Sequence, residues 1–205
     1  MRVIIVAVVV LLCLAATATA YPKGRGGVAG AGKYPHVPPP PTEQQKKYLK
    51  RTNEKFMADK AKEPGVHSLP SGLLFEIIKK SNGQGKSPKA DDDCEVLYTG
   101  MLKDGTVFIS STDRESPATV NPSNNVIKGW AEALQLMSEG DKWTLYVPHA
   151  LAYRESGVPQ PPKIPPFSAF VFEMELVNVK GPGGRTAVEA QTDLATKTGK
   201  KYEEL

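Results

Sequence analysis

The chain has 205 residues, enough for one core of ordinary size plus extensions. Its formal net charge of +4 is mild, and Lys and Arg do not cluster with interleaved aromatics, which argues against nucleic acid as a partner. The histidines, His36, His67 and His149, are scattered without metal-ligand spacing. Three consecutive aspartates occupy residues 91–93, but they are not followed by a calcium-binding loop with its glycine and distal glutamate. A solvated turn is therefore favoured over a calcium site. We therefore expect no metal and no cofactor.

Residues 1–20 predict a secretory signal peptide. One arginine precedes an apolar run from Val3 to Ala16, and residues 18–20 form an Ala-Thr-Ala cleavage site. The run is shorter than the ~20 residues of a membrane span, so no membrane anchor is expected. Cleavage removes Cys13 and leaves Cys94 alone, which excludes an intramolecular disulfide. Cys94 lies in an apolar alternation and is expected to be buried and unreactive.

The next two segments differ in character. Residues 21–41 are rich in glycine and then proline, which predicts a disordered tail with a stiff polyproline end. Thr42 and Gln45 have capping-box spacing, so a helix is expected over 42–62, ending before Pro64. Its apolar stripe is thin, enough to rest on a domain surface or a partner: Tyr48, Leu49, Phe56 and Met57.

From residue 70 onward the hydrophobic period becomes two. Strands are predicted at 71–81, 94–103, 106–111, 142–148 and 168–179, with a tight hairpin at 103–106. In the last strand Phe170, Phe172, Met174 and Leu176 alternate with largely polar residues. One helix interrupts the strands, with Gly140 as its stop and one apolar face: Trp130, Ala133, Leu134 and Met137. These elements predict an α+β fold, an antiparallel sheet wrapped on one short helix.

After Lys180 the sequence becomes polar. Residues 181–205 are therefore expected to form a mobile tail with no more than one frayed helical turn.

The sequence contains none of the motifs that supply strong catalytic chemistry. There is no phosphate-binding glycine loop, no nucleophile elbow and no Cys–His pair for nucleophilic catalysis. What stands out is a set of apolar residues close to the ends of elements, each of which alone would be read as core: Tyr98, Phe108, Val126, Ile127, Trp130, Tyr153, Ile164 and Phe172.

Three long stretches carry a resemblance to a known family. "YTGMLKDGTVFISS", "VIKGWAEALQLMSEGDKWTLYVPHALAY" and "IPPFSAFVFEMEL" resemble the FKBP-type peptidyl-prolyl cis-trans isomerases, over residues 68–179. The flanking "EPGVHSLPSGLLFEII", "RESPAT" and "LAYRESGVP" resemble the secreted macrophage infectivity potentiator branch. The resemblance implies a curved antiparallel sheet of five or six strands around the helix, with a pocket between them. It also implies isomerisation of X-Pro bonds in secretory or extracellular proteins.

The resemblance further implies roles for individual residues. Trp130 is the floor of the pocket, under the substrate proline ring, and Tyr98, Phe108 and Phe172 are walls. Val126 and Ile127 form another wall, with the Ile127 N–H donating to a substrate carbonyl. Tyr153 offers its hydroxyl near the X-Pro amide, and Ile164 closes the loop side.

The chain departs from the family pattern at three places. Ile109 stands where the family usually has an aspartate, which there pairs with an arginine matching Arg114. Two readings stay open: an active isomerase with altered substrate preference and weaker binding of macrolide inhibitors, or a proline-peptide-binding module or chaperone with little turnover. Val120 replaces an aromatic of the infectivity potentiator branch, and Arg154 replaces a glycine.

Assembly and destination are also left as alternatives. A monomer is favoured over a dimer formed through residues 42–62. Secretion is favoured over retention in the endoplasmic reticulum through YEEL at 202–205, a loose relative of the K-D-E-L signal that lacks its basic residue.

Overall fold

The structure is a computed structural model that describes residues 40–111, 116–159, 163–180 and 184–205. The predicted signal peptide, and all but the last two residues of the predicted tail, lie outside these ranges. Residues 43–205 form one structural unit. In the described part of the chain, no helix has the length and apolar character needed to span a membrane.

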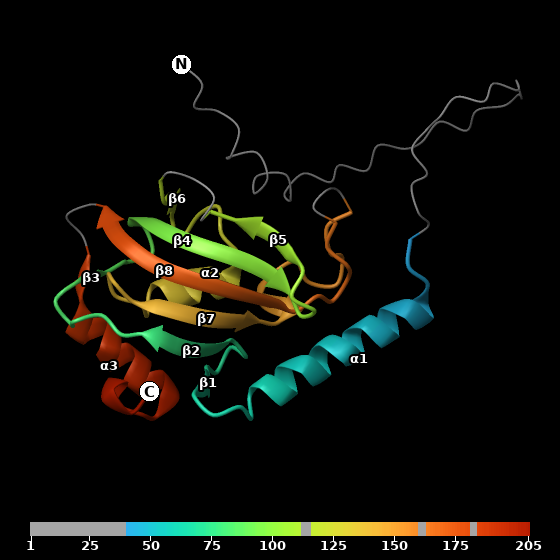
Figure 1. The fold of residues 1–205 in the computed structure, drawn as a ribbon, viewed down its shortest axis with the longest axis horizontal. Coiled ribbons are helices and arrows are strands. Elements are labelled where there is room, and N and C mark those ends of the chain that lie inside the picture. The colour runs from blue at the N-terminus through green and yellow to red at the C-terminus, as the bar shows by residue number, and fades with distance from the viewer. Residues whose placement is uncertain (1–39, 112–115, 160–162, 181–183) are drawn as a thin grey trace, which may run out of the picture. The chain divides into compact units, whose positions relative to one another are not determined.

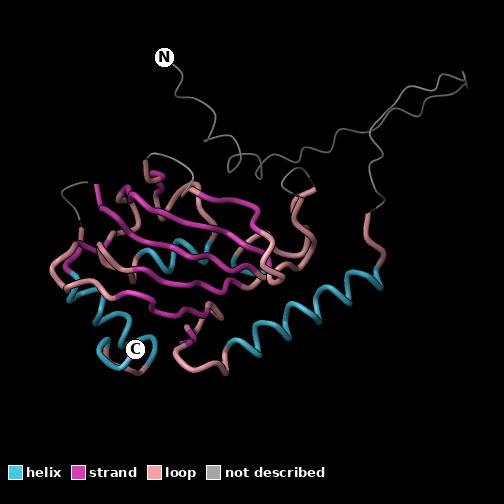
Figure 2. The backbone as a smooth tube through the Cα atoms, viewed as in Figure 1, coloured by secondary structure: helices cyan, strands magenta, loops and turns pink. Residues whose placement is uncertain are grey.

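A seven-stranded antiparallel sheet forms the centre of this unit (Figures 1 and 2). Six strands follow one another across it in the order β1 (Val66–Ser68), β2 (Leu74–Lys79), β7 (Lys142–Val147), β8 (Phe170–Lys180), β4 (Asp93–Leu102) and β5 (Val107–Ser110). The seventh, β6 (Ala118–Val120), also pairs with β4, and a separate two-stranded sheet joins β3 (Lys86–Ser87) to β9 (Arg185–Thr186). The predicted α+β fold with a large antiparallel sheet is confirmed. The sheet has seven strands, whereas the family resemblance implied five or six. β1 and β6, of three residues each, are too short to show a period of two and were not among the strands predicted from the sequence.

Alternation along β8 creates the buried face of the sheet. Phe170, Phe172, Met174 and Leu176 are buried, whereas Glu173 is exposed. The neighbouring strand β7 continues this buried face, because Leu145 lies directly opposite Phe172 in the pairing of β7 with β8. The predicted hairpin is also present, because Leu102 N–H donates to Thr106 O at 2.9 Å and Gly105 adopts φ +84° between β4 and β5.

The helix α2 (Lys128–Leu134) lies across one face of this sheet, behind β7 and β8 in Figure 1. Its predicted apolar face is buried: Trp130, Ala133, Leu134 and Met137. The prediction that the helix continues to Gly140 is wrong, since it ends at Leu134. Asp141 Oδ2 accepts a hydrogen bond from Ser138 N–H at 2.7 Å, and Gly140 adopts φ +91°, so the segment after the helix folds into a turn before β7.

The helix α1 (Glu43–Lys60) forms almost as predicted and rests on its own domain. The Phe56 ring lies edge-on to Tyr146 of β7, with centroids 6.4 Å apart, and Lys60 Nζ lies 5.2 Å from the centre of the same tyrosine ring. Its one buried residue is Asn53.

The prediction of a tail with no more than one helical turn after Lys180 is wrong. The chain forms α3 (Ala187–Thr198) and a 3-10 turn, η3 (Tyr202–Glu204); another 3-10 turn, η2 (His149–Leu151), follows β7. A capping box begins α3, in which Thr186 accepts from Glu189 N–H while the Glu189 carboxylate accepts from Thr186 N–H. Leu194 is fully buried, and the buried Tyr202 donates its hydroxyl to Asp141 Oδ1 at 2.7 Å. The segment is therefore part of the fold.

Candidate active site

Trp130 lies in the first turn of α2 and is 7% exposed. Its position depends on the preceding glycine, because a Cβ on Gly129 would lie 2.7 Å from Val147 Cγ1. The close approach of α2 to β7 directs the indole into the sheet. Its ring lies edge-on to Tyr98 of β4 at 4.7 Å and to Phe172 of β8 at 5.1 Å.

Six rings from β4, β5, α2, β8 and the loop after β7 form one network, which we call the aromatic cluster: Tyr98, Phe108, Trp130, Tyr153, Phe170 and Phe172. Phe108 lies 5.4 Å from Phe170 and 5.8 Å from Phe172, and Tyr153 lies 5.6 Å from Phe170. Most of the contacts are edge-to-face, the arrangement that the ring quadrupoles favour. The five aromatic residues predicted from the sequence are thus brought together. Phe170 completes the network, although sequence reasoning assigned it to the core alone.

The predicted aliphatic residues surround the same core. Ile164 is buried in the hydrophobic core. Val126, Ile127 and Ile109 are partly buried and pack against that core. Ile164 and Val158 exchange backbone hydrogen bonds of 2.9 Å, which closes the loop that follows Tyr153. Ile127 is the extended N-cap of α2, and its N–H donates no hydrogen bond within the described residues.

A bulge in the pairing of β4 with β5 places Ile109 beside the cluster. Gly100 pairs with Ile109 and Met101 with Val107, so Phe108 is an extra residue. A Cβ on Gly100 would lie 2.7 Å from Ile109 Cγ2 and 2.6 Å from the Phe172 ring, which shows how closely the three approach. Arg114 lies outside the described residues, so its relation to Ile109 is not defined.

The other two departures from the family pattern have clear structural settings. Val120, on β6, pairs with Cys94 and is partly buried against the core. Arg154 adopts φ +53°, a backbone conformation that glycine reaches without strain. Arg154 therefore adopts the strained left-handed backbone conformation at the position where the family usually has a glycine.

The cluster contains aromatic and aliphatic groups in place of acids and metal ligands. Among the described residues, no group of His, Cys, Asp and Glu could hold a metal ion. Cys94 is free and buried as predicted, and burial raises the pKa of its thiol to about 12. Trp130 Nε1 is buried and has no hydrogen-bond partner among the described residues, so the cluster holds one uncommitted donor. Among the described residues, the aromatic cluster itself contains no carboxylate and no histidine that could act in general acid–base catalysis.

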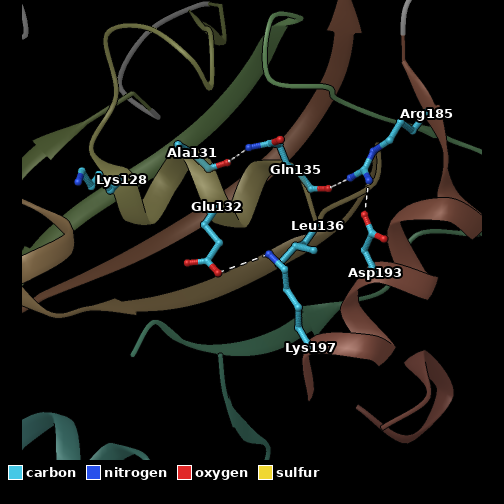
Figure 3. A pocket seen from close by; sticks show the side chains of 8 residues that line it. All are labelled: Lys128, Ala131, Glu132, Gln135, Leu136, Arg185, Asp193 and Lys197. Atoms are coloured by element: carbon cyan, nitrogen blue, oxygen red, sulfur yellow. Dashed lines mark hydrogen bonds and ion pairs between the residues drawn. The ribbon is translucent and has the colours of Figure 1, made fainter. Parts of the chain in front are cut away.

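A pocket lies between α2 and α3, and none of the predicted site residues lines it (Figure 3). Two ion pairs cross or line it, Arg185 with Asp193 and Lys197 with Glu132. Arg185 also donates to the Gln135 carbonyl at the end of α2. Sequence reasoning missed this region because it missed α3, although the Thr186–Glu189 capping box was a usable signal.

Comparison with known proteins identifies the class. The family model "FKBP-type peptidyl-prolyl cis-trans isomerase" matches residues 84–177, and "Domain amino terminal to FKBP-type peptidyl-prolyl isomerase" matches 40–77. The chain is 50% identical to the macrophage infectivity potentiator of Trypanosoma cruzi over 148 residues, 72% of this chain and 74% of that protein. It is 49% identical to the FKBP-type 22 kDa peptidyl-prolyl cis-trans isomerase of Escherichia coli over 125 residues, 61% of this chain and 58% of that one.

A solved structure supports the same assignment. A peptidyl-prolyl cis-trans isomerase from Pseudomonas syringae matches with a TM-score of 0.61 and 35% identity, over 69% of this chain and 100% of that chain. The protein belongs to the FKBP-type peptidyl-prolyl cis-trans isomerases. The reaction of this class is rotation about the peptide bond before proline, and its substrates are proline-containing peptides.

Proposed function

We propose that the aromatic cluster is the active site, where this isomerase binds the proline of X-Pro bonds in secretory or extracellular proteins. The observation that carries the proposal is the convergence of rings from five separate elements in one cluster, in which the Trp130 indole lies edge-on to Tyr98 and Phe172. Ile127, the N-cap of the helix that carries Trp130, has an N–H without a partner in the described residues. In this arrangement Trp130 supports the proline ring, and Tyr98, Phe108 and Phe172 enclose it. Ile127 N–H and the Tyr153 hydroxyl donate to substrate carbonyls, while Val126 and Ile164 border the ring.

The physical basis is preferential binding of the twisted amide. Rotation faces a barrier of ~18–20 kcal/mol because it destroys amide resonance. The planar amide has a more strongly charged carbonyl oxygen than the twisted one, so an apolar surrounding destabilises the planar state more. Hydrogen bonds that fit only the rotated geometry add to this difference. A thousandfold acceleration needs only about 4 kcal/mol, which such non-covalent contacts can supply without a cofactor.

Ile109 modifies this site. Its side chain lies beside Gly100 and Phe172, so it makes the border of the cluster apolar where the family usually has a carboxylate. We therefore expect altered substrate preference and weaker binding of macrolide inhibitors. The same substitution supports the second candidate, a proline-peptide-binding module or chaperone with little turnover.

Assembly and location are part of the proposal. α1 turns its one buried residue, Asn53, and its Phe56 ring towards its own domain, which supports a monomer over a dimer through this helix.

Secretion of the protein is supported by the signal-peptide pattern of residues 1–20. Retention through 202–205 is less favoured, because Tyr202 of that tetrapeptide is buried against Asp141.

The test is the cis–trans exchange of a short Leu-Pro peptide with the wild type, Trp130→Ala and Ile109→Asp. We expect clear acceleration by the wild type and a loss of about a hundredfold in kcat/KM for Trp130→Ala, equivalent to about 3 kcal/mol. No acceleration by the wild type, together with gain of activity in Ile109→Asp, would establish the binding module instead.

A further inference from the structure

Asn53 is an anomaly in α1. The helix is polar and largely exposed, yet this amide side chain is only 4% exposed. Its Nδ2 donates to Leu49 O at 2.8 Å, and its Oδ1 accepts from the Ala169 N–H at 2.9 Å. One partner is an acceptor and the other a donor, so together they fix the orientation of the amide.

The Ala169 N–H belongs to the end of the loop that carries Tyr153. Ala169 directly precedes β8, so its N–H has no partner in the strand ladder and relies on Asn53. Phe170, the next residue, contacts the Tyr153 ring. A side chain of α1 thus holds the backbone one residue away from the aromatic cluster.

The same loop contains two bulky residues with left-handed backbone. Phe167 has φ +59° and Arg154 has φ +53°, and the Phe167 N–H donates to the Arg154 carbonyl at 3.3 Å. Such conformations persist only where the surroundings hold them. The Phe167 ring is held by His149, edge-on at 5.2 Å, and by Lys50 of α1, whose Nζ lies 5.8 Å from the ring centre.

These contacts form a short path from α1 to the reacting groups. Asn53 fixes Ala169 and Lys50 covers Phe167, which is hydrogen-bonded to Arg154, the residue after Tyr153. We propose that Asn53 is a positioning residue of the isomerase, which acts through this loop on the placement of the Tyr153 hydroxyl. The proposal rests on the proposed active site and gives α1 a part in catalysis in addition to its packing on the domain.

The experiment is a double-mutant cycle on the full chain, with Leu-Pro peptide exchange as the readout and thermal melting as the check of folding. Asn53→Ala removes the acceptor for Ala169 and is expected to lower kcat about tenfold with little change in KM, because the Tyr153 bond forms in the transition state. In the Tyr153→Phe background the same substitution is expected to cost less than about twofold, since the group through which it acts is gone. A purely structural role would give the same loss in both backgrounds.

Thr52→Ala is the matched control. Thr52 donates to the same Leu49 carbonyl at 3.0 Å and makes no hydrogen bond to the loop among the described residues, so the activity of Thr52→Ala should equal that of the wild type. If Asn53→Ala does not fold, Lys50→Ala is used in its place, because Lys50 contacts the Phe167 ring of the same loop. We expect this substitution to lower kcat about twofold, and to have no effect in the Tyr153→Phe background.

Full activity of folded Asn53→Ala, or losses that multiply with Tyr153→Phe, would overturn the proposal. Failure of the active site itself has a different signature, because Trp130→Ala would then retain the wild-type rate.

Discussion

The two longest helices among the described residues, α1 and α3, are attached to the domain in different ways. α1 buries one residue, the polar Asn53, and contacts the domain through a few side chains at β7 and the loop before β8. α3 and the turn after it bury apolar groups, Leu194 foremost, and place Tyr202 on the carboxylate of Asp141. Asp141 also accepts from the Ser81 and Ser138 N–H groups, so the Tyr202 hydroxyl completes a buried network. The difference indicates that α3 contributes mainly to stability, whereas α1 contributes mainly to the shape of the loop that carries Tyr153.

Truncation of the α3 core should give the largest loss of stability. Leu194→Ala leaves a cavity at a fully buried position and is expected to lower the free energy of unfolding by ~2–5 kcal/mol. The fraction that remains folded should isomerise the Leu-Pro peptide at the wild-type rate. Denaturant unfolding and peptide exchange measure the two effects. Val188→Ala, at a site of the same helix that is 64% exposed, is the control and should change stability by less than ~0.5 kcal/mol.

Removal of one hydroxyl should give the next largest effect. Tyr202→Phe abolishes the hydrogen bond to Asp141 and is expected to cost ~1–3 kcal/mol, because the acceptor is a buried carboxylate. Denaturant unfolding gives the value. An unchanged unfolding midpoint would show that η3 is not held by this network.

Truncation of an aromatic side chain in α1 should affect activity more than stability. Phe56→Ala removes the edge-on contact with Tyr146, worth about 1 kcal/mol, and loosens the helix that holds the loop. We expect kcat to fall while the unfolding midpoint moves little. Tyr48→Ala, on the same helix at a site 62% exposed, should leave both unchanged. A large loss of stability with normal kcat would remove the distinction between the two helices.

The smallest expected effect is a pH dependence near the C-terminal segment. Burial and the charge of Lys200 hold the pKa of His67 below its ordinary value, and His67 Nε2 lies 3.3 Å from the Leu205 carbonyl. The unfolded state therefore takes up the proton first as pH falls, so stability should decrease below about pH 6.5. Melting temperatures at about pH 7.5 and about pH 5 should differ less in His67→Gln than in the wild type. Equal differences in both proteins would exclude His67 as the cause.

The sequence predicted the central sheet well, since strands with one buried face show a clear alternation, as β8 does. It predicted α2 too long, because Met137 continues the apolar pattern after the helix has ended and is buried in the following turn. α3 was missed because its polar composition outweighed the capping box at Thr186 and the single large apolar residue, Leu194.

The candidate site depended on information of another kind. The convergence of Tyr98, Trp130 and Phe172 follows from strand register and the approach of α2, so their positions in the chain suggested it only through family resemblance. The role of Asn53 was not predictable, because its partner Ala169 is 116 residues away and nothing in a polar helix marks one amide as buried.

The most direct test of the active site uses the two tryptophans of the chain. Both indole Nε1 groups are buried without a partner in the described residues, but Trp130 lies in the aromatic cluster whereas Trp143 stacks on Phe75 at 4.6 Å. Addition of a Leu-Pro peptide should shift the NMR signal of the Trp130 indole N–H progressively and leave that of Trp143 in place. If the peptide is isomerised while the Trp130 signal stays unchanged, the reaction takes place elsewhere and the proposed active site is wrong.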